Sequence, residues 1–295
     1  MKKLVQNALF ILTTIAGLLF FMAFPRLFSL RTSGSEHIDI ELAALLKTMS
    51  ATAEQLFKPS SWQFLESWYQ ETVIERYTYS IEIISVSLLF TVFIGSFIAY
   101  LFMTLPYSHR SKVKHILNFF GGLPDLLIIF LMQLVLITLF REFDIRLVNM
   151  YGLAGKEPLI FPMIINSFLP SLFLAQFLIK IMEDEFEKHY ILLGQAKGLS
   201  KMQILFVHLT RNIVPVVSIH FKTIIYLVLT NLVLVEHMFI LDGYIQELYN
   251  LMMTPGVSPA KILFYVGVFM LPVILLERLV TFFGKFVGKA RGLNI

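Results

Sequence analysis

Six long apolar runs alternate with polar segments along the chain. They cover roughly residues 8–28, 81–103, 117–139, 159–180, 213–234 and 262–283. A run of about 20 apolar residues is long enough to cross the hydrocarbon core of a bilayer as a helix. Lipid offers the backbone no hydrogen-bond partners, so a spanning segment has to be helical. The pattern therefore predicts an all-α polytopic membrane protein with six transmembrane helices.

The first run begins like a signal peptide, because Lys2 and Lys3 precede it. No small-residue cleavage site follows, and the sequence continues MAFPRLF instead. We expect this segment to be retained as the first span.

Composition supports a bilayer environment and charge orients the chain in it. Hydrophobic residues make up 57% of the sequence and charged residues only 15%, which is too apolar for a soluble domain. With the N-terminus inside, the inner segments carry 12 Lys and Arg in 64 residues, against 8 in 98 for the outer segments. The positive-inside rule then predicts cytoplasmic N- and C-termini. The net charge of +4 therefore reports membrane topology, and nothing favours binding of nucleic acid.

We expect a single membrane domain over residues 1–295. It would comprise the first span at 1–28, an outer loop at 29–80, a five-helix core at 81–283 with a cytoplasmic loop at 181–212, and a tail at 284–295. Apolar residues recur at helical spacing between Ile38 and Leu56, which predicts an amphipathic helix in the outer loop.

The cytoplasmic loop at 181–212 reads as two short helices around a glycine corner. An apolar stripe from Met182 to Leu193 predicts the first helix, with the acids 183–185 at its N-terminal end. Gly198 is a natural left-handed stop, and Ser200 with Gln203 forms a capping box. A second helix is expected from Lys201 to about residue 213. Its buried side is predicted to contain Met202, Leu205, Phe206 and Leu209.

Residues 190–217, YILLGQAKGLSKMQILFVHLTRNIVPVV, resemble the cytoplasmic loop of ABC transporter permease subunits of the dipeptide/oligopeptide importer family. The matching positions are Tyr190, Ala196, Lys197, Gly198, Leu199, Ser200, His208, Arg211, Asn212 and Pro215 to Val217. RYTYSIEI at 76–83 and VEHMFILDG at 235–243 are similar to two other segments of that family, next to its second and fifth spans. Asp242 and Thr78 stand where the family has proline.

The resemblance implies a type I ABC importer permease fold in a bacterial cell membrane. The permease would form half of the pathway for a peptide-like solute; a metal chelate or another small solute is the alternative. The implied partners are a second permease subunit, two cytoplasmic ATPase subunits that bind ATP and Mg, and an extracytoplasmic solute-binding protein. The residues that would dock on the ATPase are Glu187, Lys188, Gly194, Gln195, Ala196, Lys197, Gly198, Leu199 and Ser200.

Ionisable residues inside spans are a second kind of candidate, because they are costly in hydrocarbon and often functional. Asp125 and Lys222 each lie about nine residues into a predicted span, roughly 13 Å deep. We expect Asp125 and Lys222 to form an intramembrane ion pair, which either holds the helices together or contacts the substrate. Glu82 and Glu236 fall at outer edges of spans, where an interfacial role is expected.

Other classes of function lack their motifs. The chain has no GxxxxGK[ST], so ATP hydrolysis is expected in partner subunits and not here. The sequence contains no HxxxH or HExxH pair and no cysteine, so nothing indicates a metal site. It also lacks the GxSxG motif that an intramembrane hydrolase would be expected to carry. A secondary transporter, which usually shows internal repeats, is the less favoured alternative.

Overall fold

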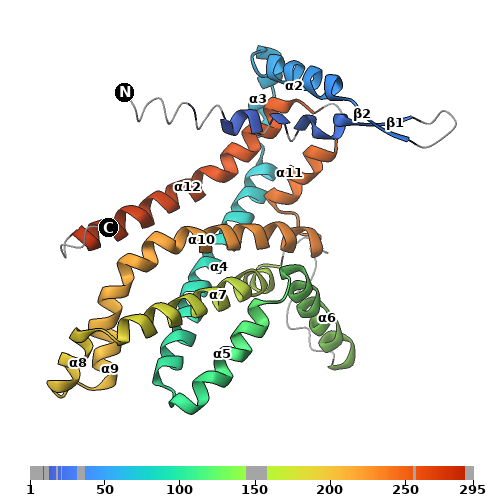
Figure 1. The fold of residues 1–295 in the computed structure, drawn as a ribbon. Helices are drawn as coiled ribbons and strands as arrows, with labels where there is room; N and C mark the ends of the chain where they lie inside the picture. Colours follow the sequence, from blue (N-terminus) through green and yellow to red (C-terminus); the bar gives the residue numbers. More distant parts are fainter. Residues whose placement is uncertain are drawn as a thin grey trace. The chain divides into compact units, whose positions relative to one another are not determined.

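The computed structural model describes residues 9, 13–17, 19–20, 22–31, 37–143, 158–254 and 257–289. These residues are almost entirely helical, apart from one two-stranded ribbon (Figure 1). Two compact units are distinguished, Met1–Val73 with Leu248–Met270 and Ile74–Glu247 with Leu271–Ile295, and each is described by itself. The organisation of 1–295 as a single membrane domain stays a prediction.

Four helices within the described ranges are long and apolar enough to cross a membrane. They are Thr72–Thr104, Ile160–Phe186, Lys201–Met238 and Pro259–Val287. They correspond to the predicted second, fourth, fifth and sixth spans and fit a membrane protein. Of the predicted first span, 8–28, the structure describes residues 9, 13–17, 19–20 and 22–28, and those up to residue 23 are α-helical. Its described end is not α-helical, because Phe24–Leu27 form the 3-10 helix η1 and Phe28 begins a strand.

The predicted third span, 117–139, is not one straight helix. Helix α5 (Tyr107–Gly121) and helix α6 (Asp125–Phe143) meet at 97° across a short break. Pro124 at the break cannot donate a backbone hydrogen bond and disfavours helical geometry in the residue before it. If this bent pair counts as one span, the described residues contain five.

The first unit contains strands β1 (Phe28–Arg31) and β2 (His37–Ile40), which pair antiparallel with Phe28 opposite Ile40. They are followed by helix α2 (Leu42–Leu56), the 3-10 helix η2 (Pro59–Trp62) and the short helix α3 (Leu65–Trp68). Helix α2 confirms the predicted amphipathic helix from Leu42 to Leu56, but the predicted start at Ile38 was wrong, because that residue lies in β2. Trp68 packs edge-on against Phe264, with ring centroids 5.2 Å apart.

The second unit is built around α7 (Ile160–Phe186) and α10 (Thr210–Met238). Most of α4 (Glu71–Thr104) and the C-terminal part of α12 (Pro259–Lys289) also belong to it. Between α7 and α10 come α8 (His189–Ala196), α9 (Lys201–Gln203) and the π-helix η3 (Ile204–Leu209), and α11 (Tyr244–Met253) follows α10. One core cluster joins α6, α7 and the end of α10 through Ile129, Phe161, Ile165, Val235, Phe239 and Leu241.

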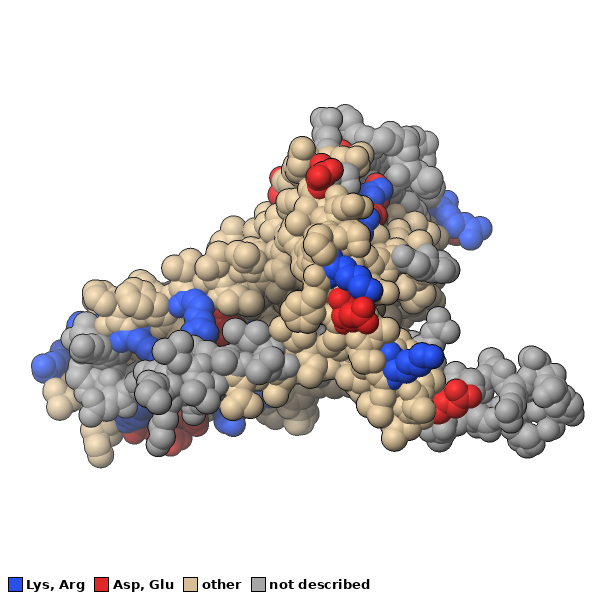
Figure 2. Space-filling model, turned by 90° about the horizontal axis from the view of Figure 1, so that it is seen from above, with Lys and Arg blue, Asp and Glu red and all other residues tan. Residues whose placement is uncertain are grey.

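Figure 2 shows one face of the molecule, on which most of the described surface carries no Lys, Arg, Asp or Glu. Large apolar side chains such as Phe93, Leu89 and Phe286 are more than 60% exposed. A soluble protein rarely leaves so much apolar surface in water. The surface therefore fits a protein whose helices are surrounded by lipid.

Candidate functional site

Residues 187–203, which we call the elbow, turn the chain back between α7 and α10. Helix α8 ends in a Schellman motif: the Leu199 amide donates to the Gly194 carbonyl at 3.1 Å, and the Gly198 amide to the Gln195 carbonyl at 2.9 Å. Gly198 has φ +77°, the left-handed conformation that favours glycine. The predicted glycine corner is confirmed.

A capping box begins the helix after the corner, as predicted. The Gln203 amide donates to Ser200 Oγ at 3.3 Å, and the Ser200 amide donates to Gln203 Oε1 at 3.0 Å. Each side chain thus satisfies a backbone amide that the first helical turn leaves without a partner. Corner and cap together give the elbow a defined shape.

The predicted first helix of the loop differs from the structure. Helix α7 continues to Phe186, so Glu183 and Glu185 lie at a helix C-terminus and not at an N-terminus. Acids are unfavourable next to the C-terminal carbonyls. Both have cationic partners that offset this: Lys114 Nζ lies 2.7 Å from Glu183, and Lys188 pairs with Glu185.

The predicted second helix is present, but its buried face is shifted. Ile204, Leu205 and Leu209 are buried, whereas Met202 and Phe206 are more than half exposed. Phe206 lies in the π-helix Ile204–Leu209, whose wider turns change the angular spacing that an α-helix would give, whereas Met202 precedes it in α9. The prediction that Met202 and Phe206 belong to the buried side was wrong.

Most of the predicted docking residues are accessible. Glu187, Lys188, Gln195, Ala196, Lys197, Gly198 and Ser200 are exposed, Leu199 is half-buried and Gly194 is buried. Nearby apolar side chains are exposed as well: Leu192, Leu193, Met202, Phe206 and Val207 each leave more than half of their surface uncovered. Exposed apolar side chains in a segment that also carries charged residues are typical of a protein contact surface.

Tyr190 fastens the base of the elbow to the end of α7. Its hydroxyl donates to Glu185 Oε1 at 3.0 Å, and burial raises the pKa of Tyr190 to about 12. Behind it, a cavity of about 220 Å³ opens between Tyr190, Gly194, Lys197 and His208. The cavity is thus lined by the charged side chain of Lys197 and the imidazole of His208.

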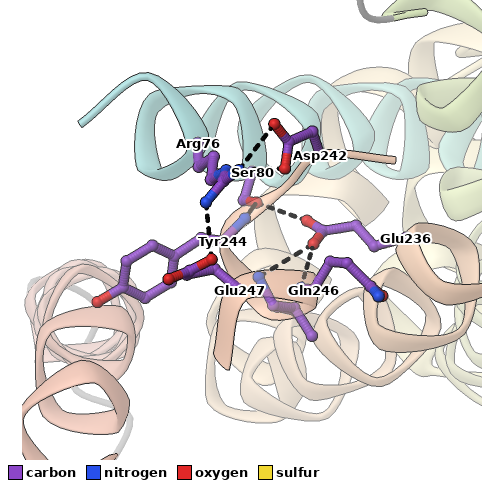
Figure 3. A network of polar contacts seen from close by, with 8 residues as sticks. Arg76, Ser80, Glu236, Asp242, Tyr244, Gln246 and Glu247 are labelled. Atoms are coloured by element: carbon purple, nitrogen blue, oxygen red, sulfur yellow. Dashed lines mark hydrogen bonds and ion pairs between the residues drawn. The ribbon is translucent and has the colours of Figure 1, made fainter. Parts of the chain in front are cut away.

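A second polar cluster, the corner network, joins α4 to the turn between α10 and α11 (Figure 3). It consists of Arg76, Ser80, Glu236, Asp242 and Glu247. Arg76 Nε lies 2.7 Å from Asp242 Oδ1, and Arg76 Nη1 lies 2.7 Å from Glu247 Oε2. The structure thus brings together the segments 76–83 and 235–243, which the sequence analysis singled out separately.

Glu236 is the centre of this network and is completely buried. Ser80 Oγ donates to Oε1 at 2.5 Å, and the amides of Ile245 and Gln246 donate to Oε2 at 3.0 and 3.1 Å. These donors hold Glu236 inside the protein, and the interfacial role expected for it stays a prediction. Glu82, in contrast, is exposed.

The structure does not bring Asp125 and Lys222 together. Asp125 begins α6 at the break after α5, whereas Lys222 Nζ lies 3.4 Å from Glu277 Oε1 on α12. Tyr226 joins this pair by donating its hydroxyl to Glu277 Oε2 at 3.1 Å. Sequence reasoning passed over Glu277, although an acid within an apolar helix was the available signal.

Among the described residues, no group of three or more His, Asp and Glu side chains is arranged to hold a metal ion. Comparison with known proteins adds no identity: no family model matches the chain, and no curated protein is significantly similar to it.

Proposed function

We propose that this chain is a permease subunit of an ATP-driven importer in a bacterial cell membrane, with six spans and both termini in the cytoplasm. The observation that carries the proposal is the elbow. A rigid corner leads without interruption into the membrane-spanning helix Lys201–Met238. Force applied to such a corner moves the whole helix, which is what a separate ATPase needs in order to drive transport.

The surface of the elbow supports a protein partner. Five exposed apolar side chains lie among Glu187, Lys188, Lys197 and Lys201. Burial of such a patch in a groove of an ATPase subunit would provide affinity, and the surrounding charges would provide orientation. ATP and Mg would be bound by that subunit. A second permease subunit would complete the pathway, and a solute-binding protein would deliver a peptide-like solute.

Co-purification tests the proposal. The tagged chain is isolated from its native membranes, and partners are identified by peptides containing GxxxxGK[ST] and by ATPase activity of the complex. We expect wild type to bring ATPase subunits. Gly198→Leu forces a branched side chain into the left-handed conformation and should lose them.

Gly267→Leu is the matched control. Gly267 lies within α12, and a Cβ there meets nothing within 4 Å. This variant should insert into the membrane and keep the ATPase. Absence of ATPase subunits from the wild-type preparation, or their full retention by Gly198→Leu, would contradict the proposal.

A further inference from the structure

Lys222 and Glu277 form an ion pair within two helices that are apolar enough to span a membrane. Lys222 lies 11 residues beyond Arg211, or about 16 Å along the helix, and Glu277 lies eight residues before Lys285, or about 12 Å. Both distances approach half of the roughly 30 Å hydrocarbon thickness. Lys222 therefore lies inside an apolar stretch of α10, whereas Glu277 on α12 has a second charged residue, Arg278, directly after it.

The side chain of Lys222 is not enclosed by its own chain. It is 56% exposed, compared with 22% for Glu277. Ionisable groups at membrane depth face a water-filled cavity or another protein segment, because exposure to lipid is too costly. The face of α10 that carries Lys222 is thus expected to border water or protein.

The geometry leaves the pair open to an added ligand. The distance of 3.4 Å between Lys222 and Glu277 is longer than a tight charge-assisted hydrogen bond. The pair formed by Lys114 and Glu183 in the same unit is closer, at 2.7 Å. An ammonium carries three hydrogen-bond donors, so Lys222 can bind the carboxylate of a ligand and keep its contact with Glu277. Glu277 in turn has lone pairs left beside those used by Tyr226.

An apolar cavity adjoins these charges. Its volume is about 430 Å³, and it is lined by α4, α10 and α12. Ile225 and Val273 line it, and Glu277 follows Val273 by one helical turn, on the same face of α12. Apolar pockets with a few polar groups at one side are the usual form of a small-molecule site.

We propose that Lys222, Glu277 and Tyr226, with the adjoining cavity, form a solute-contact site for a zwitterion that carries an apolar side chain, such as a short peptide. Lys222 binds the carboxylate, Glu277 binds the ammonium, and the apolar side chain occupies the cavity. The proposed site rests on the proposed function, because it lies on a translocation pathway only if this chain transports a solute.

Binding of three probes to the full-length chain in lipid nanodiscs tests the site. The probes are radiolabelled leucyl-leucine, its N-acetyl derivative and its C-terminal amide. Wild type should bind leucyl-leucine at least about tenfold more tightly than either capped form, the effect of losing one charged hydrogen bond. Equal binding of all three, or no saturable binding, overturns the proposal even if ATPase subunits co-purify.

Variants assign the two charges. Lys222→Met should weaken leucyl-leucine about tenfold and leave the amide nearly unchanged, whereas Glu277→Gln should spare the N-acetyl form. Lys180→Met, an exposed lysine in the span Ile160–Phe186, is the matched control and should bind as wild type does. Val273→Trp fills the cavity, leaves both charged residues in the sequence and should weaken all three probes.

The outcomes are separable. Unchanged leucyl-leucine affinity in Lys222→Met and Glu277→Gln overturns the assignment, and it indicates that a neighbouring subunit covers these charges. If a charge variant binds all three probes equally weakly, that variant does not assign the charge. The comparison of the three probes on the wild-type chain then tests the proposal. Failure of ATPase co-purification alone contradicts the proposed function and leaves a binding site on a protein of another class.

Discussion

The carboxylate of Glu236 occupies the space in which residue 243 would carry a Cβ atom. A methyl group built on Gly243 collides with all three atoms of that carboxylate. The acid itself cannot move aside without loss of its bonds to Ser80, Ile245 and Gln246. Position 243 therefore has to be glycine, because only a residue without a side chain leaves room for the carboxylate of Glu236, which accepts hydrogen bonds from the first amides of α11.

Gly243→Ala should destabilise the chain by about 2–3 kcal/mol, because overpacking would break hydrogen bonds of a buried carboxylate. The free energy of unfolding in mixed micelles measures the effect. Gly267→Ala is the control: an added Cβ there has open space and should stabilise α12 by about 0.5–1 kcal/mol. Similar results for the two variants would show that the contact at position 243 is readily relieved.

The two acidic partners of Arg76 should differ in strength. Asp242 is 57% exposed and Glu247 is 19% exposed. Water screens the first pair more than the second, so Asp242→Asn should cost less than about 1 kcal/mol. Glu247→Gln should cost more. A double-mutant cycle with Arg76→Gln measures both coupling energies, and a larger coupling to Asp242 would refute this ranking.

Ser200→Ala should remove the capping box and cost about 1 kcal/mol of local stability. The loss is expected at the backbone amide of Gln203, which donates to Ser200 Oγ and belongs to the first helical turn, whose amides have no intrahelical acceptor. Hydrogen exchange should therefore accelerate there, while Ser200→Thr keeps the acceptor and the protection. Unchanged exchange in Ser200→Ala would mean that the cap contributes little.

The raised pKa of Tyr190 gives stability a defined dependence on pH. The unfolded chain loses this proton near the ordinary tyrosine pKa of 10, whereas the folded chain holds it until about pH 12. The contribution is therefore complete below pH 10 and decreases as pH rises from 10 to 12. Difference titration of tyrosinate absorbance, wild type minus Tyr190→Phe, should show a group with a midpoint near 12; a midpoint near 10 would contradict it.

Local features of the elbow were predictable, because their causes lie within a few residues. Gly198 adopts a conformation that disfavours side chains, and Ser200 needs only Gln203 to form its box. The break between α5 and α6 had a comparable signal, two glycines and a proline in GGLPD at 121–125. The apolar count over 117–139 concealed it.

The sites that depend on distant residues were not predictable in the same way. Glu236 looks like any acid at a span edge until Ser80 and the α11 amides surround it. The partner of Lys222 was misjudged because equal depth suggested Asp125, whereas helix packing supplies Glu277. Which helices adjoin is a tertiary fact that periodicity along one helix does not contain.

The π-helix Ile204–Leu209 fixes the direction in which the elbow faces. Its backbone accommodates one residue more than an α-helix of the same rise, and Tyr100 closes the widened turn by stacking on Phe206 and bonding to Thr210. Each residue of an α-helix turns the chain by about 100°. Deletion of a single residue between 204 and 209 would keep the spans and the elbow. The elbow would then point in a different direction around the axis of α10.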